Sequence, residues 1–177
     1  IITKEYSDAD VIVMSEVARD CGSYNNHQDG PEYFAKSLKM NYAYIPEFIS
    51  YDSSTRNSWW SPNSLYKRFL GQTDNSQCTM GNMILSKYPF SSLEVIRFKS
   101  QCCMFPQRSG GRVTIGAGIS IGGKDLQIYS THLESGTGIK DFLEAYYIRV
   151  KQIDEIVDNY NAKNENYKES HQGQELP

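Results

Sequence analysis

The order of apolar patterns along the chain predicts an α/β or α+β fold, in which helices cover β-sheets. A continuous apolar run at 10–14 predicts a buried strand. Strict alternation over 113–121 predicts a strand with one apolar face, and the Gly122-Gly123 pair after it predicts a hairpin turn. A three-then-four spacing predicts an amphipathic helix within 139–160, carried by Leu143, Tyr146, Val150, Ile153 and Val157.

Shorter patterns supply the remaining elements. Proline suits the first helical position, so a helix is expected to start near Pro31. Strands are expected at 42–50, which contains an edge proline, and at 82–86 and 93–98. On the strand that returns from the hairpin, one face is predicted to carry Leu126, Ile128, Ser130 and His132.

Length and composition favour one domain over residues 1–177. Within it, 51–77 is expected to be a long loop or insertion and 161–177 a polar loop or tail. The formal net charge of −3 argues against a strong non-specific nucleic-acid binder. No apolar run approaches the roughly 20 residues that span a bilayer.

The cysteines leave the redox setting open. Cys21, Cys78, Cys102 and Cys103 show no spacing typical of a metal site. Disulfides and buried free thiols are both compatible with this pattern. Localisation therefore stays unknown.

Two residues lie where strands end, which is where layered folds place their ligand sites. Glu16 follows the apolar run at 10–14, and a carboxylate there suits a hard cation such as Mg²⁺. His132 ends the strand that returns from the hairpin, where an imidazole can donate to a phosphoryl oxygen or relay a proton. Each also has a plain structural interpretation, Glu16 as a solvated cap and His132 as a buried hydrogen-bonding group.

Two further residues lie beside flexible backbone. Arg112 follows Gly110-Gly111, and an arginine there suits bidentate phosphate contact or is simply surface charge. Asn82 follows Gly81 at the start of a strand, which taken alone is only a turn. The Trp59-Trp60 pair could stack on bases or sugars, or pack the 51–77 loop onto its own domain.

The chain resembles the endonuclease/exonuclease/phosphatase superfamily in five segments that occur in the superfamily's order. This superfamily includes pancreatic-type deoxyribonucleases, apurinic-site endonucleases, neutral sphingomyelinases and inositol-polyphosphate phosphatases. The resemblance runs from about Ala9 to Val157. The five segments are DVIVMSEV (10–17), MNYAYIPEF (40–48), GNMILSKYPF (81–90), GGR (110–112) and YSTHLES (129–135).

The resemblance implies a four-layer sandwich of two mostly antiparallel sheets flanked by helices. It also implies phosphoester or phosphodiester hydrolysis that depends on Mg²⁺, Mn²⁺ or Ca²⁺. Glu16 matches the superfamily's metal-binding glutamate and His132 the histidine that contacts the scissile phosphate. Asn82 and Arg112 match phosphate-side positions, and Glu47 a motif near the site. Arg149 and Gln152 match an R-x-x-Q pattern that we expect to be structural.

Several motifs of the superfamily have no counterpart in this sequence. The asparagine of the first strand, G-D-x-N and the terminal S-D-H are missing. We therefore expect an incomplete domain that is inactive as the 177-residue chain alone, with further chain segments or partner chains completing the sheets.

Three functional hypotheses follow. The first is a metal-dependent phosphoesterase acting on nucleic acid, phospholipid or a small phosphoester. The second is a non-catalytic relative that serves as a binding or structural subunit of a larger assembly. The third is an unrelated all-β binding module with glycine hairpins.

Overall fold

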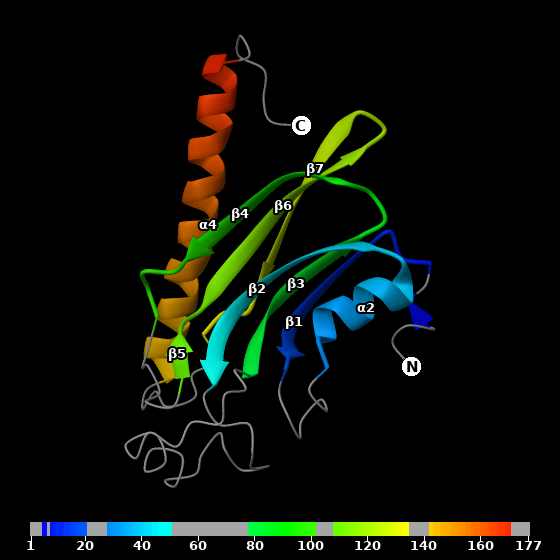
Figure 1. Ribbon diagram of the computed structural model, residues 1–177. Coiled ribbons are helices and arrows are strands. Elements are labelled where there is room, and N and C mark those ends of the chain that lie inside the picture. The colour runs from blue at the N-terminus through cyan, green and yellow to red at the C-terminus, as the bar shows by residue number, and fades with distance from the viewer. Residues whose placement is uncertain are drawn as a thin grey trace, which may run out of the picture.

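The computed structural model describes residues 5–6, 8–20, 28–50, 78–101, 108–134 and 142–170. These residues form two antiparallel sheets, a short helix and a long one (Figure 1). The first sheet has the strand order β1-β3-β2-β5 and the second β4-β6-β7. The strands are β1 (Val11–Arg19), β2 (Asn41–Ser50), β3 (Cys78–Ser86), β4 (Phe90–Arg97), β5 (Arg108–Gly110), β6 (Val113–Ile121) and β7 (Lys124–Thr131), and the helices are α2 (Gly30–Leu38) and α4 (Phe142–Ser170).

Strand β3 shows why the sheets are layered. It lies between β1 and β2, and Met83, Ile84 and Leu85 are fully buried, so both of its faces are covered. Met83 and Leu85 pack toward α2, together with Val17, Ala35 and Met40. On the opposite face Ile84 packs against residues of β6, the inward side of the alternation that the sequence predicted; this inter-sheet cluster consists of Ala43, Ile84, Ile115, Ala117 and Ile119.

The hairpin between β6 and β7 and helix α2 confirm the predictions made from glycine and proline in the sequence. Gly122 and Gly123 have φ values of 58° and 81°, a left-handed backbone that glycine adopts at little cost. Helix α2 begins with Asp29, whose side chain accepts a hydrogen bond from the Glu32 amide at 2.9 Å. Pro31 occupies the first turn, as expected.

Helix α4 joins the outer face of the second sheet through polar contacts. Lys163 Nζ lies 2.7 Å from Glu94 Oε1 on β4, and the Tyr129 hydroxyl on β7 donates to the same oxygen at 2.9 Å. Glu94, Gly116 and Tyr129 lie opposite one another in the strand registers. With α2 on the first sheet and α4 on the second, the order of layers is helix, sheet, sheet, helix, which confirms the predicted sandwich (Figure 1).

The prediction of a polar loop or tail at 161–177 did not anticipate that 161–170 is helical, because α4 continues to Ser170. Residues 161–170 have no apolar side chains repeating at helical spacing, so the hydrophobic pattern of the sequence could not predict that the helix continues. Ion pairs hold it instead, from Lys163 to Glu94 and from Lys168 to Glu165, three residues earlier in the same helix. The predicted loop at 51–77, the remainder of the tail and the cysteine side chains lie outside the described residues.

The apolar stripe of α4, which an amphipathic helix would bury against the sheet, is exposed. Leu143, Tyr146 and Ile153 are about half exposed, at 59%, 52% and 48%. The side of the helix that faces the sheet instead carries Ala145 and Gln152, both buried. Among the described helices, none combines the length and apolar character that crossing a bilayer requires.

Glu155 of α4 yields a prediction about pH. Its carboxylate accepts the backbone N–H groups of Lys99 and Ser100, each at 2.9 Å. Burial alone would raise the pKa of Glu155, but these two amides outweigh it and hold the pKa below 4.5. A depressed pKa in the folded state stabilises the protein above the unfolded value, and this stabilisation is lost as the pH falls through the folded value.

We therefore expect Glu155→Gln to be less stable than the wild type at neutral pH. The difference should shrink as the pH falls below 4.5, where the wild-type carboxylate becomes protonated. Urea unfolding of both proteins between pH 7 and pH 3 measures it. A stability difference that stays constant over this range would contradict the assignment.

A candidate active site at the strand ends

Glu16 occupies a bulge in β1. The pairing of β1 with β3 shifts register between Met14 and Val17, and Glu16 has a φ of 58°. A left-handed backbone at a residue other than glycine costs about 1–3 kcal/mol and persists only where surrounding structure imposes it. Regular pairing on both sides of the bulge imposes it here, and the Glu16 side chain is left 65% exposed.

His132 follows directly after β7, which ends at Thr131. Strands β1 and β7 belong to different sheets, and a hydrogen bond joins them: the Ser130 hydroxyl donates to the Met14 carbonyl at 3.3 Å. Each of these residues is two positions from a candidate site residue. His132 Nδ1 accordingly lies 3.7 Å from Glu16 Oε1, so the end of β7 meets the bulge in β1. The expectation that Glu16 follows the end of its strand is wrong, because β1 resumes its pairing with β3 after the bulge and continues to Arg19.

Arg112 and Glu47 form a buried ion pair beneath His132. Arg112 Nη1 donates to Glu47 Oε1 at 2.9 Å, and only 9% and 1% of the two side chains are exposed. The same Nη1 lies 2.8 Å from His132 Nδ1, and Glu47 Oε2 lies 3.4 Å from that nitrogen. Burying either charge without the other would be costly, so the pair fixes where both side chains lie.

This contact assigns the tautomer of the imidazole. A guanidinium has five N–H donors and no acceptor. His132 Nδ1 must therefore accept the hydrogen bond from Arg112, and in the neutral ring the proton lies on Nε2. We refer to Glu16, Glu47, Arg112 and His132 as the four-residue cluster.

Asn82 lies deeper than its predicted role as a phosphate contact suggests. It is fully buried, and its Nδ2 donates to the Val113 carbonyl at 2.7 Å, which ties β3 to β6 beside Arg112. Its Oδ1 is buried and has no partner among the described residues. Arg112 is also buried, with its Nη1 bound to Glu47 and His132. For both residues, phosphate contact stays a prediction.

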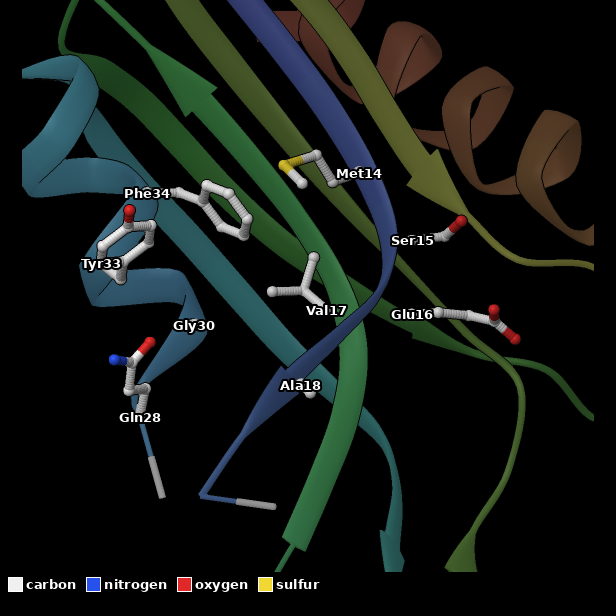
Figure 2. A pocket seen from close by; sticks show the side chains of 9 residues that line it. All are labelled: Met14, Ser15, Glu16, Val17, Ala18, Gln28, Gly30, Tyr33 and Phe34. Atoms are coloured by element: carbon white, nitrogen blue, oxygen red, sulfur yellow. The ribbon is translucent and has the colours of Figure 1, made fainter. Parts of the chain in front are cut away.

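An open pocket of about 310 Å³ borders the bulge on its α2 side. Figure 2 shows Met14, Val17 and Phe34 lining it, while the Glu16 side chain extends away from the rings of Tyr33 and Phe34. The pocket is thus mostly apolar and adjoins the backbone that carries Glu16.

The charges of the cluster suit a cation. The two carboxylates and the one guanidinium of the cluster sum to a formal charge of −1. In the described part of the chain, no three His, Cys, Asp or Glu side chains gather closely enough to hold a metal ion. An exposed carboxylate at a negative rim nevertheless suits Mg²⁺, which commonly uses one or two carboxylates and keeps several waters. Glu16 therefore fits as one ligand of such an ion.

The sequence did not reveal two contacts of the site. Gln101 Oε1 accepts the Arg112 backbone N–H at 2.9 Å, yet no local pattern marks this exposed residue. Ser130 carries a weak signal, because it is a polar residue in the otherwise apolar row of Leu126 and Ile128. Only the tertiary structure shows that it bonds to β1.

Comparison with solved structures finds proteins of similar fold. The fold is similar to the crystal structure of an endonuclease/exonuclease/phosphatase from Beutenbergia cavernae DSM 12333, with a TM-score of 0.56 and 16% sequence identity. The chain has the endonuclease/exonuclease/phosphatase fold. The match covers 89% of this chain and 36% of that one, so the chain spans little more than a third of its neighbour and its sheets are incomplete relative to that fold.

A second similar structure is an endonuclease/exonuclease/phosphatase family protein from Leptotrichia buccalis C-1013-b, with a TM-score of 0.46 and 11% identity. The match covers 82% of this chain and 51% of that one. No family model matches the sequence, and no curated protein does. The fold of the first of these structures is the fold that the resemblance of the five sequence segments implied.

The strain at Glu16 is testable by comparing two substitutions that both remove the carboxylate. We expect Glu16→Gly to be more stable than Glu16→Ala by about 1 kcal/mol, because glycine adopts a positive φ without the steric cost that alanine pays. Denaturant unfolding of the two variants measures the difference. Equal stability, or a more stable alanine variant, would show that the bulge is unstrained.

The buried ion pair makes a separate prediction. Arg112→Met should destabilise the protein by about 3–5 kcal/mol, because it leaves the Glu47 carboxylate buried and unpaired. Adding Glu47→Leu should recover much of that loss. Lys36→Met, which removes the exposed pair with Glu32, is the control and should change stability far less. Additive effects of the two cluster substitutions in a double-mutant cycle would contradict the coupling.

Proposed function

We propose that this protein is the central part of a divalent-metal-dependent phosphoesterase. The observation that carries the proposal is the meeting of the β1 bulge with the end of β7, which belongs to the other sheet, with His132 Nδ1 3.7 Å from the Glu16 carboxylate. The resemblance in sequence attaches metal binding to one of these residues and phosphate contact to the other. The shared fold supports the same family of activities.

Glu16 would hold the metal ion, whose chemistry is to neutralise the charge of a phosphoester and to favour a hydroxide nucleophile. The carboxylate is exposed, and the bulge holds it beyond the regular strand. Because the left-handed backbone imposes this direction before any ligand arrives, little rearrangement would be needed on binding.

His132 would donate its Nε2–H to a phosphoryl oxygen. Arg112 occupies the other ring nitrogen as a donor, which keeps the neutral tautomer with the proton on Nε2. A donor aimed at an oxygen that gains charge stabilises the transition state more than the ground state. Glu47 balances the charge of Arg112 and so allows a guanidinium to be buried behind the imidazole.

The substrate remains a class: nucleic acid, phospholipid or a small phosphoester. The formal charge of −3 does not favour extended contact with a nucleic-acid backbone.

The test uses protein expressed from the complete open reading frame. We expect Mg²⁺-dependent hydrolysis of bis-p-nitrophenyl phosphate, and a loss of roughly 10²-fold or more in Glu16→Ala and in His132→Ala. Glu32→Ala on α2 is the control, because that carboxylate lies outside the cluster and pairs with Lys36. The activity of this variant should match that of the wild type.

Two results would count against the proposal. Undiminished activity in both cluster variants would remove the site assignment. A folded wild-type protein that hydrolyses neither nucleic acid, phospholipid nor a small phosphoester would favour the non-catalytic relative, a binding or structural subunit with the same fold.

A further inference from the structure

Helix α4 contacts the two backbone segments that carry Arg112 and His132. Gln152 is fully buried, and its side-chain amide accepts one hydrogen bond and donates another. Its Oε1 accepts the Glu134 backbone N–H at 2.9 Å, and its Nε2 donates to the Ser100 carbonyl at 2.9 Å. Glu134 is two residues after His132, while Ser100 belongs to the segment after β4.

The segment after β4 holds the backbone of Arg112 on both sides. The Phe98 N–H donates to the Arg112 carbonyl at 3.4 Å, and Gln101 Oε1 accepts the Arg112 N–H at 2.9 Å. Arg112 is therefore fastened to residues 98–101 rather than to a ladder of β6, which begins at Val113. A displacement of Ser100 would therefore also displace Arg112, because Phe98 and Gln101 on either side of Ser100 are hydrogen-bonded to the Arg112 backbone.

Two other residues of α4 form hydrogen bonds with the same two backbone segments. Arg149 Nη1 donates to the Glu134 backbone carbonyl at 3.1 Å. The backbone N–H and the backbone carbonyl of Glu134 are therefore both hydrogen-bonded to side chains of α4. Glu155 accepts the N–H groups of Lys99 and Ser100. Residues 149, 152 and 155 are spaced three apart and so lie along one side of the helix.

Only an amide satisfies both partners of Gln152. The Glu134 N–H requires an acceptor and the Ser100 carbonyl requires a donor, and a carboxylate is acceptor-only. A buried group left without its partner costs about 1–3 kcal/mol, so the two segments stay where the amide reaches both. The distance between these segments is thereby tied to the length of one side chain.

We propose that Gln152 is a positioning residue: through Ser100 and Gln101 on one side and Glu134 on the other, it sets the separation of the Arg112 guanidinium and the His132 imidazole. The hydrogen bond between those two groups, 2.8 Å long, assigns the imidazole tautomer. Gln152 thus controls which ring nitrogen carries the proton without touching the ring. The importance of that proton rests on the proposed function, whereas the positioning itself can be measured without substrate or metal.

The experiment is ¹⁵N NMR of the histidine side chains in protein from the complete open reading frame, with His132→Ala to assign the ring signals. In the wild type we expect Nδ1 of His132 to show the shift of an unprotonated acceptor and Nε2 that of a protonated nitrogen. Gln152→Glu at neutral pH keeps the acceptor for Glu134 and loses the donor to Ser100. The His132 signals of this variant should move toward a mixture of the two tautomers.

Asp154→Asn is the matched control, because this exposed residue lies on the same helix and the substitution is of the same size. Its His132 signals should equal those of the wild type. In the catalytically active protein, Gln152→Glu should lower kcat by roughly 10–100-fold, as expected for a misplaced catalytic group, with a smaller change in KM. Unchanged His132 signals in folded Gln152→Glu would overturn the proposal.

A second pair of substitutions decides the matter if Gln152→Glu does not fold. Gln101→Glu keeps an acceptor for the Arg112 N–H, and Gln101→Met removes it from an exposed position where folding is less at risk. We expect altered His132 signals in the methionine variant alone. Wild-type signals in both variants would overturn the proposal. Absence of phosphoesterase activity would defeat the proposed function and leave the NMR result to judge the positioning.

Discussion

The buried ion pair between Arg112 and Glu47 is the constraint on which the candidate site depends. A charge removed from water is tolerated only with a well-placed partner, so neither side chain can move far without the other. Glu47 comes from β2 in the first sheet, and Arg112 precedes β6 in the second. The pair therefore fixes the two sheets relative to each other at the end where the strands carry polar residues, and the imidazole of His132 is fixed with them.

The interface between the sheets changes character along the strands. Its middle is apolar, where Ile84 meets Ile115 and Ala117. Toward the site the contacts become directional: the Asn82 amide donates to a carbonyl of the opposite sheet, and the Ser130 hydroxyl does the same in the other direction. Apolar contact holds the sheets together without specifying their offset, whereas hydrogen bonds of fixed geometry specify it. A site assembled from both sheets needs that specification.

The strained backbone of the site lies in β1, whereas the contacts that support its buried side come from α4. Glu16 adopts an unfavourable backbone that directs its carboxylate to the rim, and the pairing of β1 with β3 on either side of the bulge sustains it. The buried side of the site relies on α4, which bonds to the backbone near His132 and near Arg112 through polar side chains. The apolar stripe of the same helix makes no such contribution in the described part of the chain, because it is exposed.

The sequence by itself determined the strands other than β5, the hairpin, the start of α2 and the place of His132 at the end of β7. Those features depend on local periodicity and on the backbone preferences of glycine and proline, which act over a few neighbouring residues. The tertiary structure alone decided that Glu16 sits in a left-handed bulge, that Arg112 is buried against Glu47, and that α4 continues to Ser170. Each of these arises from contacts between residues far apart in the chain, or from ion pairs that leave no apolar period, so no window of sequence contains the information.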